Sequence, residues 1–107
     1  MLRFTRGDSV EWPVLYKVRG VPVDLSTYLI SAEIRAKDGT FICALSADVL
    51  DQAFYPGRYI LRQDRVTTAG LRPGSYFFDI QYTSYPDYTV VHTTSPQPLI
   101  IDPGWRV

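Results

Sequence analysis

Apolar and polar residues alternate along this chain in short runs that recur from one end of the sequence to the other. The first run covers residues 9–18 and places apolar residues at every second position: Val10, Trp12, Val14, Tyr16 and Val18. Successive side chains of a β-strand point to opposite faces of a sheet, so this period predicts a strand with one buried face. Pro13 lies inside the run and cannot donate a hydrogen bond to a neighbour, which predicts an edge strand or a bulged one.

The next runs predict a hairpin followed by a third strand. Residues 29–36 alternate in the same way, and Asp38-Gly39 comes directly after them. Asp-Gly between two alternating runs is a strong signal for a tight turn, so we expect the return strand over residues 41–46. We expect residues 47–53 to form a loop or a single helical turn. A short strand is then predicted over residues 58–62, and a polar connection over residues 63–70.

The last part of the chain predicts three more strands. Residues 76–82 carry a second clear stripe, made of Tyr76, Phe78, Ile80 and Tyr82. A hairpin loop over 84–88 and strands over 89–93 and 98–101 follow. About seven short strands with regular turns predict an all-β fold, an immunoglobulin-like antiparallel β-sandwich, with a small antiparallel β-barrel as the alternative. A chain of 107 residues fits one domain spanning 1–107.

Charge and composition exclude several classes of function. The chain has 11 basic and 11 acidic residues, hence no net charge, whereas a general nucleic-acid binder carries a basic excess. We therefore expect no nucleic-acid partner. Cys43 is the only cysteine, so an internal disulfide is impossible. No stretch has the length of a membrane span, and the first residues lack a signal peptide, so we expect no membrane association.

Two sequence patterns resemble known families. The segment Leu71-Arg72-Pro73-Gly74-Ser75-Tyr76 resembles the tyrosine-corner loop of immunoglobulin-like and fibronectin type III domains. There, the tyrosine hydroxyl bonds back to the backbone. The resemblance implies a structural corner formed by Leu71, Pro73, Gly74 and Tyr76.

The wider layout resembles a group of small phage-encoded proteins found among tail and baseplate genes. The segments that carry this resemblance are Arg6-Gly7-Asp8-Ser9, Gly20-Val21-Pro22-Val23-Asp24-Leu25-Ser26 and residues 71–80, followed by an apolar closing strand. The resemblance implies a structural role in a virion and partners that are other virion proteins or copies of the chain itself. It also implies a location in the virion, or in the host bacterial cytoplasm before assembly.

The residues that carry chemistry do not form a catalytic pattern. His92 is the only histidine and has no neighbouring ligand, and Cys43 alternates with Phe41 and Leu45 as a core residue does. Most aspartates fall in turns, where they cap their own backbone. A calcium site between Asp48 and Asp51, or Asp38 and Asp24, is the less favoured alternative. We expect no enzyme, no catalytic residue, no cofactor and no metal.

Aromatic residues outside the stripes are the candidate interface. They are Tyr55, Tyr85, Tyr88 and Trp105. Exposed tyrosine and tryptophan anchor many protein interfaces, and they also stack on sugars. We expect a protein interface, and a carbohydrate- or receptor-binding module is the alternative. The tripeptide Arg6-Gly7-Asp8 matches a cell-adhesion signal, but three-residue matches often arise by chance, and ordinary turn chemistry before a strand is the favoured explanation.

Overall fold

The structure is a computed structural model that describes residues 2–104. It is all-β, as the sequence predicts, apart from one short helix, α1 (Arg65–Ala69). The strands are β1 (Leu2–Thr5), β2 (Val10–Leu15), β3 (Lys17–Val18), β4 (Val21–Pro22), β5 (Tyr28–Arg35), β6 (Phe41–Val49), β7 (Arg58–Gln63), β8 (Gly74–Ser84), β9 (Thr89–Thr93) and β10 (Gln97–Asp102).

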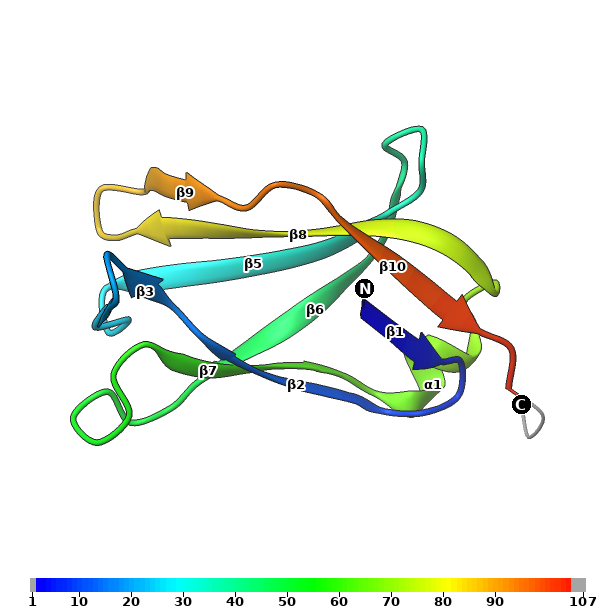
Figure 1. Cartoon of the computed structure of the whole chain (residues 1–107), viewed down its shortest axis with the longest axis horizontal. Helices are drawn as coiled ribbons and strands as arrows, with labels where there is room; N and C mark the ends of the chain where they lie inside the picture. The colour runs from blue at the N-terminus through cyan, green and yellow to red at the C-terminus, as the bar shows by residue number, and fades with distance from the viewer. Residues whose placement is uncertain (1, 105–107) are drawn as a thin grey trace.

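The main sheet has the strand order β1-β10-β8-β5-β6-β7-β2, with β9 also paired to β8 (Figure 1). All pairs in it are antiparallel except β1 with β10. Strand β6 pairs with β5 through residues 41–45 and with β7 through residues 46–49. The sheet turns along β6 and becomes nearly closed and barrel-like. The barrel alternative of the sequence analysis describes this form, and β3 and β4 make a separate ribbon.

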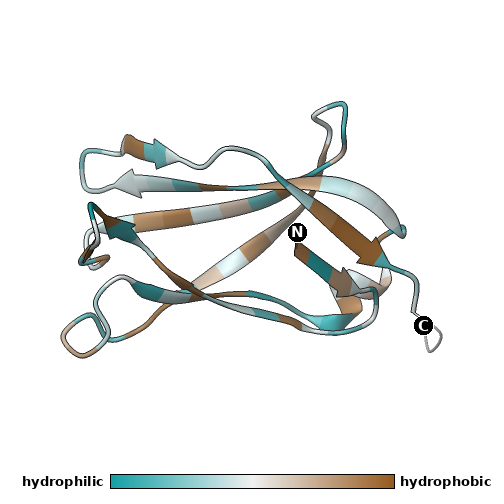
Figure 2. Cartoon of the chain, in the orientation of Figure 1, coloured by the Kyte–Doolittle hydropathy of each residue, from teal (hydrophilic) through white to brown (hydrophobic). Residues whose placement is uncertain are grey.

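Alternate residues of the strands fill the interior. Figure 2 shows hydrophobic residues along β5 and β10, for example. The predicted stripe of β8 is confirmed, since Phe78, Ile80 and Tyr82 are buried, and so is the buried position of Cys43. The other core residues are Phe4, Val10, Leu25, Ala32, Ile34, Leu45, Tyr59, Leu61, Leu99 and Ile101.

Trp12 packs across the gap between the first and last strands of the sheet. Its ring meets those of Phe4 on β1 and Phe78 on β8 edge to face, with centroids 6.0 and 5.6 Å apart. Strand β2 ends the sheet order, so the edge position predicted from Pro13 is confirmed. The side chain of Trp12 thus bridges strands that no backbone ladder joins.

Two predicted boundaries are wrong, and one predicted connection contains a helix. The run 9–18 is interrupted at Tyr16, and Val18 belongs to β3 and is 48% exposed. The return strand continues to Val49, because residues 46–49 pair with β7. The connection 63–70 contains α1, whose N-cap residue Asp64 accepts a hydrogen bond from the Thr67 N–H at 2.7 Å. Such caps stabilise a helix start by about 1 kcal/mol.

Strand β1 was not predicted, because four residues hold too few alternations to reveal a period. It pairs in parallel with β10 and buries Phe4. None of the helices among residues 2–104 has the length and apolar character that crossing a membrane requires.

Candidate functional site

Three connections gather at one end of the long axis, on the left in Figure 1. They are residues 16–27, which include the β3–β4 ribbon, residues 50–57 between β6 and β7, and residues 85–88 between β8 and β9. We call this surface the loop end. Helix α1 and the end of β10 lie toward the opposite end.

Gln52 ties the first two connections together. Its Oε1 accepts hydrogen bonds from the N–H groups of Leu25 at 2.9 Å and Gly57 at 2.8 Å. Its Nε2 donates to the carbonyl oxygens of Leu50 at 2.8 Å and Arg58 at 3.2 Å. One amide side chain therefore forms hydrogen bonds with four backbone groups of two connections, which fixes the shape of these loops.

Tyr85 ties the third connection to the first. Its hydroxyl donates to the carbonyl of Ser26 at 2.7 Å, and its N–H donates to the carbonyl of Thr27 at 3.0 Å. Gly57 brings the second connection against Tyr16, whose N–H donates to the Gly57 carbonyl at 2.7 Å. The loop end is thus one surface held together by hydrogen bonds.

Large apolar side chains stand exposed on this surface. Phe54 is 78% exposed, Tyr88 68%, Val21 64% and Tyr55 52%. Single exposed apolar residues are ordinary, so the feature of interest here is that all three connections at this end expose at least one.

The backbone of Tyr88 is strained. Its φ is +55°, a left-handed conformation that bulky residues seldom adopt and that costs of order 1 kcal/mol or more. The side chains around Asp87 fix this turn: Asp87 accepts from Ser84 Oγ at 2.9 Å and from Thr89 Oγ1 at 3.1 Å. These hydrogen bonds lower the pKa of the Asp87 carboxyl. The turn therefore holds an exposed tyrosine where asparagine or glycine fits better.

The predicted interface residues have different positions. Tyr55 and Tyr88 lie exposed on the loop end, and so does Tyr85, although its hydroxyl is used to join two loops. Trp105 lies outside the described residues. Phe54 and Val21 also lie exposed here, although neither was predicted as an interface residue. For Phe54 the sequence offers a signal, because it lies next to Tyr55 and outside any stripe.

The corner segment lies at the opposite end from these loops. The Tyr76 hydroxyl donates to the carbonyl of Arg72 at 2.7 Å, which is the backbone contact that defines a tyrosine corner. Leu71 packs against the core, and Gly74 has a φ of +151°, which a side chain would strain. Pro73 completes the turn before β8.

The Arg6-Gly7-Asp8 tripeptide is engaged with α1. Arg6 donates to the carbonyl of Ala69, and the Gly7 N–H donates to Thr68 Oγ1 at 3.1 Å. The fully buried Thr68 hydroxyl also donates to the carbonyl of Asp8 at 2.7 Å. These contacts give the tripeptide a structural role that joins β1 to α1.

His92 and Cys43, the two residues weighed as possible reactive groups, are packed against the fold: His92 against aromatic rings and Cys43 in the core. The His92 ring is stacked beside Tyr16 and Tyr82, with centroids 6.2 and 6.1 Å apart. Burial raises the pKa of the Cys43 thiol, which disfavours the reactive thiolate.

The aspartates that could have formed a calcium site accept hydrogen bonds from backbone N–H groups or, for Asp48, form an ion pair with Arg62. Asp24 and Asp38 accept from the N–H groups of Ser26 and Thr40, each at 2.9 Å. Hydrogen bonding by the Ser26 N–H lowers the pKa of the Asp24 carboxyl, and hydrogen bonding by the side chain and then the N–H of Thr40 lowers the pKa of the Asp38 carboxyl. Asp51 accepts from the Ala53 N–H at 3.0 Å. Within residues 2–104, no three His, Cys, Asp or Glu side chains gather as a metal site requires.

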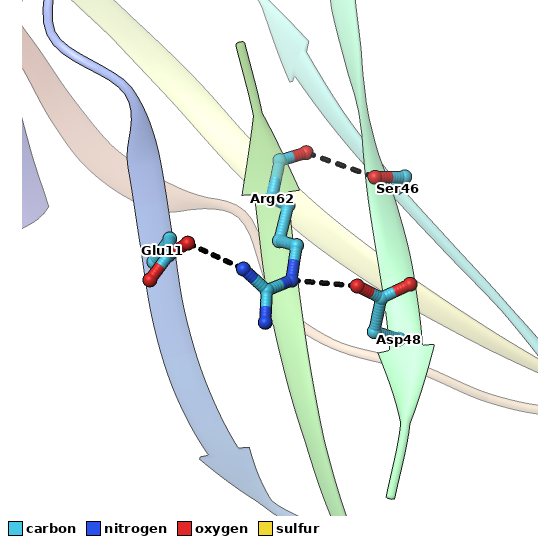
Figure 3. A network of polar contacts seen from close by, with 4 residues as sticks. All are labelled: Glu11, Ser46, Asp48 and Arg62. Carbon is cyan, nitrogen blue, oxygen red and sulfur yellow. Dashed lines mark hydrogen bonds and ion pairs between the residues drawn. The ribbon is translucent and has the colours of Figure 1, made fainter.

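Arg62 connects three strands on the outer face of the sheet (Figure 3). It lies opposite Glu11 of β2 and Ser46 of β6, and forms ion pairs with Glu11 and Asp48. Its Nε is 2.6 Å from a carboxylate oxygen of Asp48, and its carbonyl accepts from Ser46 Oγ at 3.2 Å. This network holds β2, β7 and β6 in register.

A hollow of about 350 Å³ lies on the outer face of β5 and β8 beside the β5–β6 turn. Its walls include Phe77, Pro96 and Asp79. Its Glu33 and Arg35 form an ion pair with each other. The charges are therefore largely neutralised within the hollow, which is less distinctive than the loop end.

The chain is thus a small all-β protein that exposes large apolar side chains on three hydrogen-bonded connections at one end. Comparison with models of known families, and with curated protein sequences, finds no match for this chain.

Proposed function

We propose that this chain is a non-catalytic structural protein that binds other proteins through its loop end. The proposal is supported by the exposed side chains of Phe54 and Tyr55 on one connection of the loop end and of Tyr88 on another, and by the hydrogen bonds of Gln52 and Tyr85 that hold these connections in place. A rigid aromatic surface loses little conformational entropy on binding, and tyrosine and phenylalanine are enriched at interfaces.

An immunoglobulin-like arrangement supports the same location for the interface. The order β10-β8-β5-β6, with β7 beside β2, follows the order of strands in variable-type immunoglobulin sheets, and Tyr76 supplies the corner. In that arrangement the connections β2–β5 and β8–β9 correspond to two of the three loops that antibodies use for recognition. Fold alone does not give function, so this analogy supports only where contact occurs.

We further propose that the bound proteins belong to a phage or prophage virion, in its tail or baseplate. The sequence resemblance to small tail- and baseplate-associated proteins supports this, and zero net charge favours dense packing of copies. The chain then resides in the virion, or in the host bacterial cytoplasm before assembly.

The experiment compares incorporation of two variants into particles. A triple variant, Phe54→Ser, Tyr55→Ser and Tyr88→Asn, removes the aromatic surface. The control Phe41→Ser removes an aromatic of similar exposure (52%) that lies on β6. Each gene replaces the natural one in the strain that encodes it, and gradient-purified particles are probed with an antibody against the chain.

We expect the triple variant to be reduced at least tenfold in particles and the control to be retained. Equal incorporation of both variants contradicts the loop end as the contact surface. The same purified proteins are applied to a glycan array. Wild-type binding that the triple variant loses would place the function in carbohydrate recognition instead.

A further inference from the structure

Strand β9 has an outer edge that no strand covers among residues 2–104. Both β9 and β10 pair with the same side of β8, at residues 81–84 and 74–78 respectively. Strand β1 covers β10 from Leu99 onward, whereas β9 pairs with β8 alone and lies at the margin of the molecule (Figure 1). Backbone N–H and C=O groups along such an edge are available to another strand.

This edge lacks the usual protection against pairing. Its residues are Thr89, Val90, Val91, His92 and Thr93, all exposed, with no proline, lysine or carboxylate among them. Edge strands of natural proteins are normally blunted by charge, by proline or by a covering element. The edge formed by β2 follows that rule, because it contains Pro13 and Glu11.

β9 is also held in a fixed position. The His92 ring is stacked on those of Tyr82 and Tyr16, and Asp87 anchors the turn before Thr89. Val91 is the extra residue of a bulge, since Tyr82 pairs with His92 and Thr83 with Val90. A bulge limits an added strand to a short ladder, so we expect weak pairing rather than open-ended aggregation.

The side chains beside the edge suit a second copy of the same strand. Leu29, Thr83 and Val90 form one cross-strand row, in which Leu29 and Val90 are 49% and 51% exposed. Two uncharged strands meet without repulsion, and a chain with zero net charge adds none over longer range. A second Val90 would extend the row.

We propose that β9 of one copy pairs with β9 of a second copy, antiparallel across a two-fold axis, so that two sheets become one. The pairing names a second copy of the chain as one partner in the proposed function, and it rests on the proposal that the chain acts by contact with proteins. It concerns a different surface from the loop end.

Sedimentation velocity of the purified full chain tests the pairing from about 1 µM to about 1 mM, where a small interface dissociates. The test variant is Val90→Lys with Val91→Lys. The matched control is Phe41→Lys with Val66→Lys, which places the same charges on exposed positions of β6 and α1, outside both β9 and the loop end. We expect wild type and control to dimerise with rising concentration, and the β9 variant to associate at least tenfold more weakly. A monomeric wild type, or equal association of both variants, overturns the proposal.

Crosslinking locates the contact directly. In a Cys43→Ala background, single cysteines are placed at Val90, Val91 and Thr93, and Thr40→Cys on the β5–β6 turn is the control. Residues opposite each other on antiparallel strands lie within disulfide range. We expect oxidation to link at least one β9 variant into dimers well beyond the control, and equal linking contradicts the pairing. A negative result in the sedimentation and crosslinking experiments would overturn the β9 pairing but not the proposed function. The particle experiment tests that function separately, because it measures contact between the loop end and other proteins.

Discussion

The hydroxyl oxygens of Tyr59 and Tyr82 lie 2.5 Å apart in the core, and the two rings meet at 81°. The residues come from β7 and β8, which are not neighbours in the sheet order, so this hydrogen bond spans the interior. Tyr16 stacks on Tyr82 at 4.0 Å between centroids, and it begins the first connection of the loop end. The core pair thus supports the surface to which we assign function.

Removing one hydroxyl of this pair is expected to destabilise more than removing both. Tyr59→Phe leaves the buried Tyr82 hydroxyl without its partner, which costs about 1–3 kcal/mol of unfolding free energy. The double variant Tyr59→Phe with Tyr82→Phe leaves no orphan, so its loss should fall well below the sum of the two single losses. Urea unfolding of the wild type, Tyr59→Phe, Tyr82→Phe and the double variant measures the four unfolding free energies of this cycle. Additive losses would contradict the hydrogen bond between the two hydroxyls.

Stability should fall in alkaline solution. Burial, then the hydrogen bond with Tyr82, raises the pKa of Tyr59, and burial raises that of Tyr82. Unfolded tyrosines ionise near pH 10, so above about pH 10 the unfolded chain binds fewer protons than the folded one. The contribution of the two buried, protonated tyrosines to the unfolding free energy is complete below about pH 10. Above that pH it is lost, by up to about 1.4 kcal/mol per pH unit for each tyrosine.

Urea midpoints measured between about pH 8 and pH 11 test this dependence. The double variant Tyr59→Phe with Tyr82→Phe removes both buried phenols and should show a flatter decline than wild type. A wild-type midpoint that stays constant to about pH 11 would contradict the buried state of the pair.

Alanine should be tolerated at Gly39 far better than at Gly57. Both glycines have positive φ, +91° and +77°, so each substitution strains the backbone by about 1–2 kcal/mol. A Cβ at Gly39 meets no atom within 4 Å, but one at Gly57 lies 2.5 Å from the Tyr16 carbonyl oxygen. We expect Gly57→Ala to cost about 3 kcal/mol or more. Thermal unfolding compares the two, and equal losses would refute the close approach.

The Arg62 network should contribute modestly and in a salt-dependent way. Glu11 and Asp48 are mostly exposed, so Arg62→Met is expected to cost about 1 kcal/mol at low salt and less at about 1 M salt. The control Arg65→Met alters an exposed arginine of α1 and should change stability by less than about 0.5 kcal/mol. A loss of Arg62→Met that is independent of salt would indicate packing rather than ion pairing.

Local patterns in the sequence predict the strands, because burial on one face leaves a period of two. This holds for Phe78, Ile80 and Tyr82 of β8, and for Cys43 of β6. Helix α1 escapes that signal, since it is set by the Asp64 cap and by buried contacts of Thr68 rather than by periodicity.

The loop end was only partly predictable for a different reason. Tyr55 and Tyr88 could be singled out because they stand outside the stripes. The hydrogen bonds of Gln52 to Leu25, and of Tyr85 to Ser26, join residues 27 and 59 positions apart. No local pattern encodes such distant contacts, so the ordered surface emerges only in the folded chain.

Whether the chain is part of a virion can be decided by quantitative mass spectrometry of gradient-purified particles from the strain that encodes it. A structural virion protein is predicted to co-purify at a fixed number of copies relative to the other particle proteins. That ratio should be the same across independent preparations. Absence of the chain from intact particles, or a copy number that varies between preparations, would contradict the account.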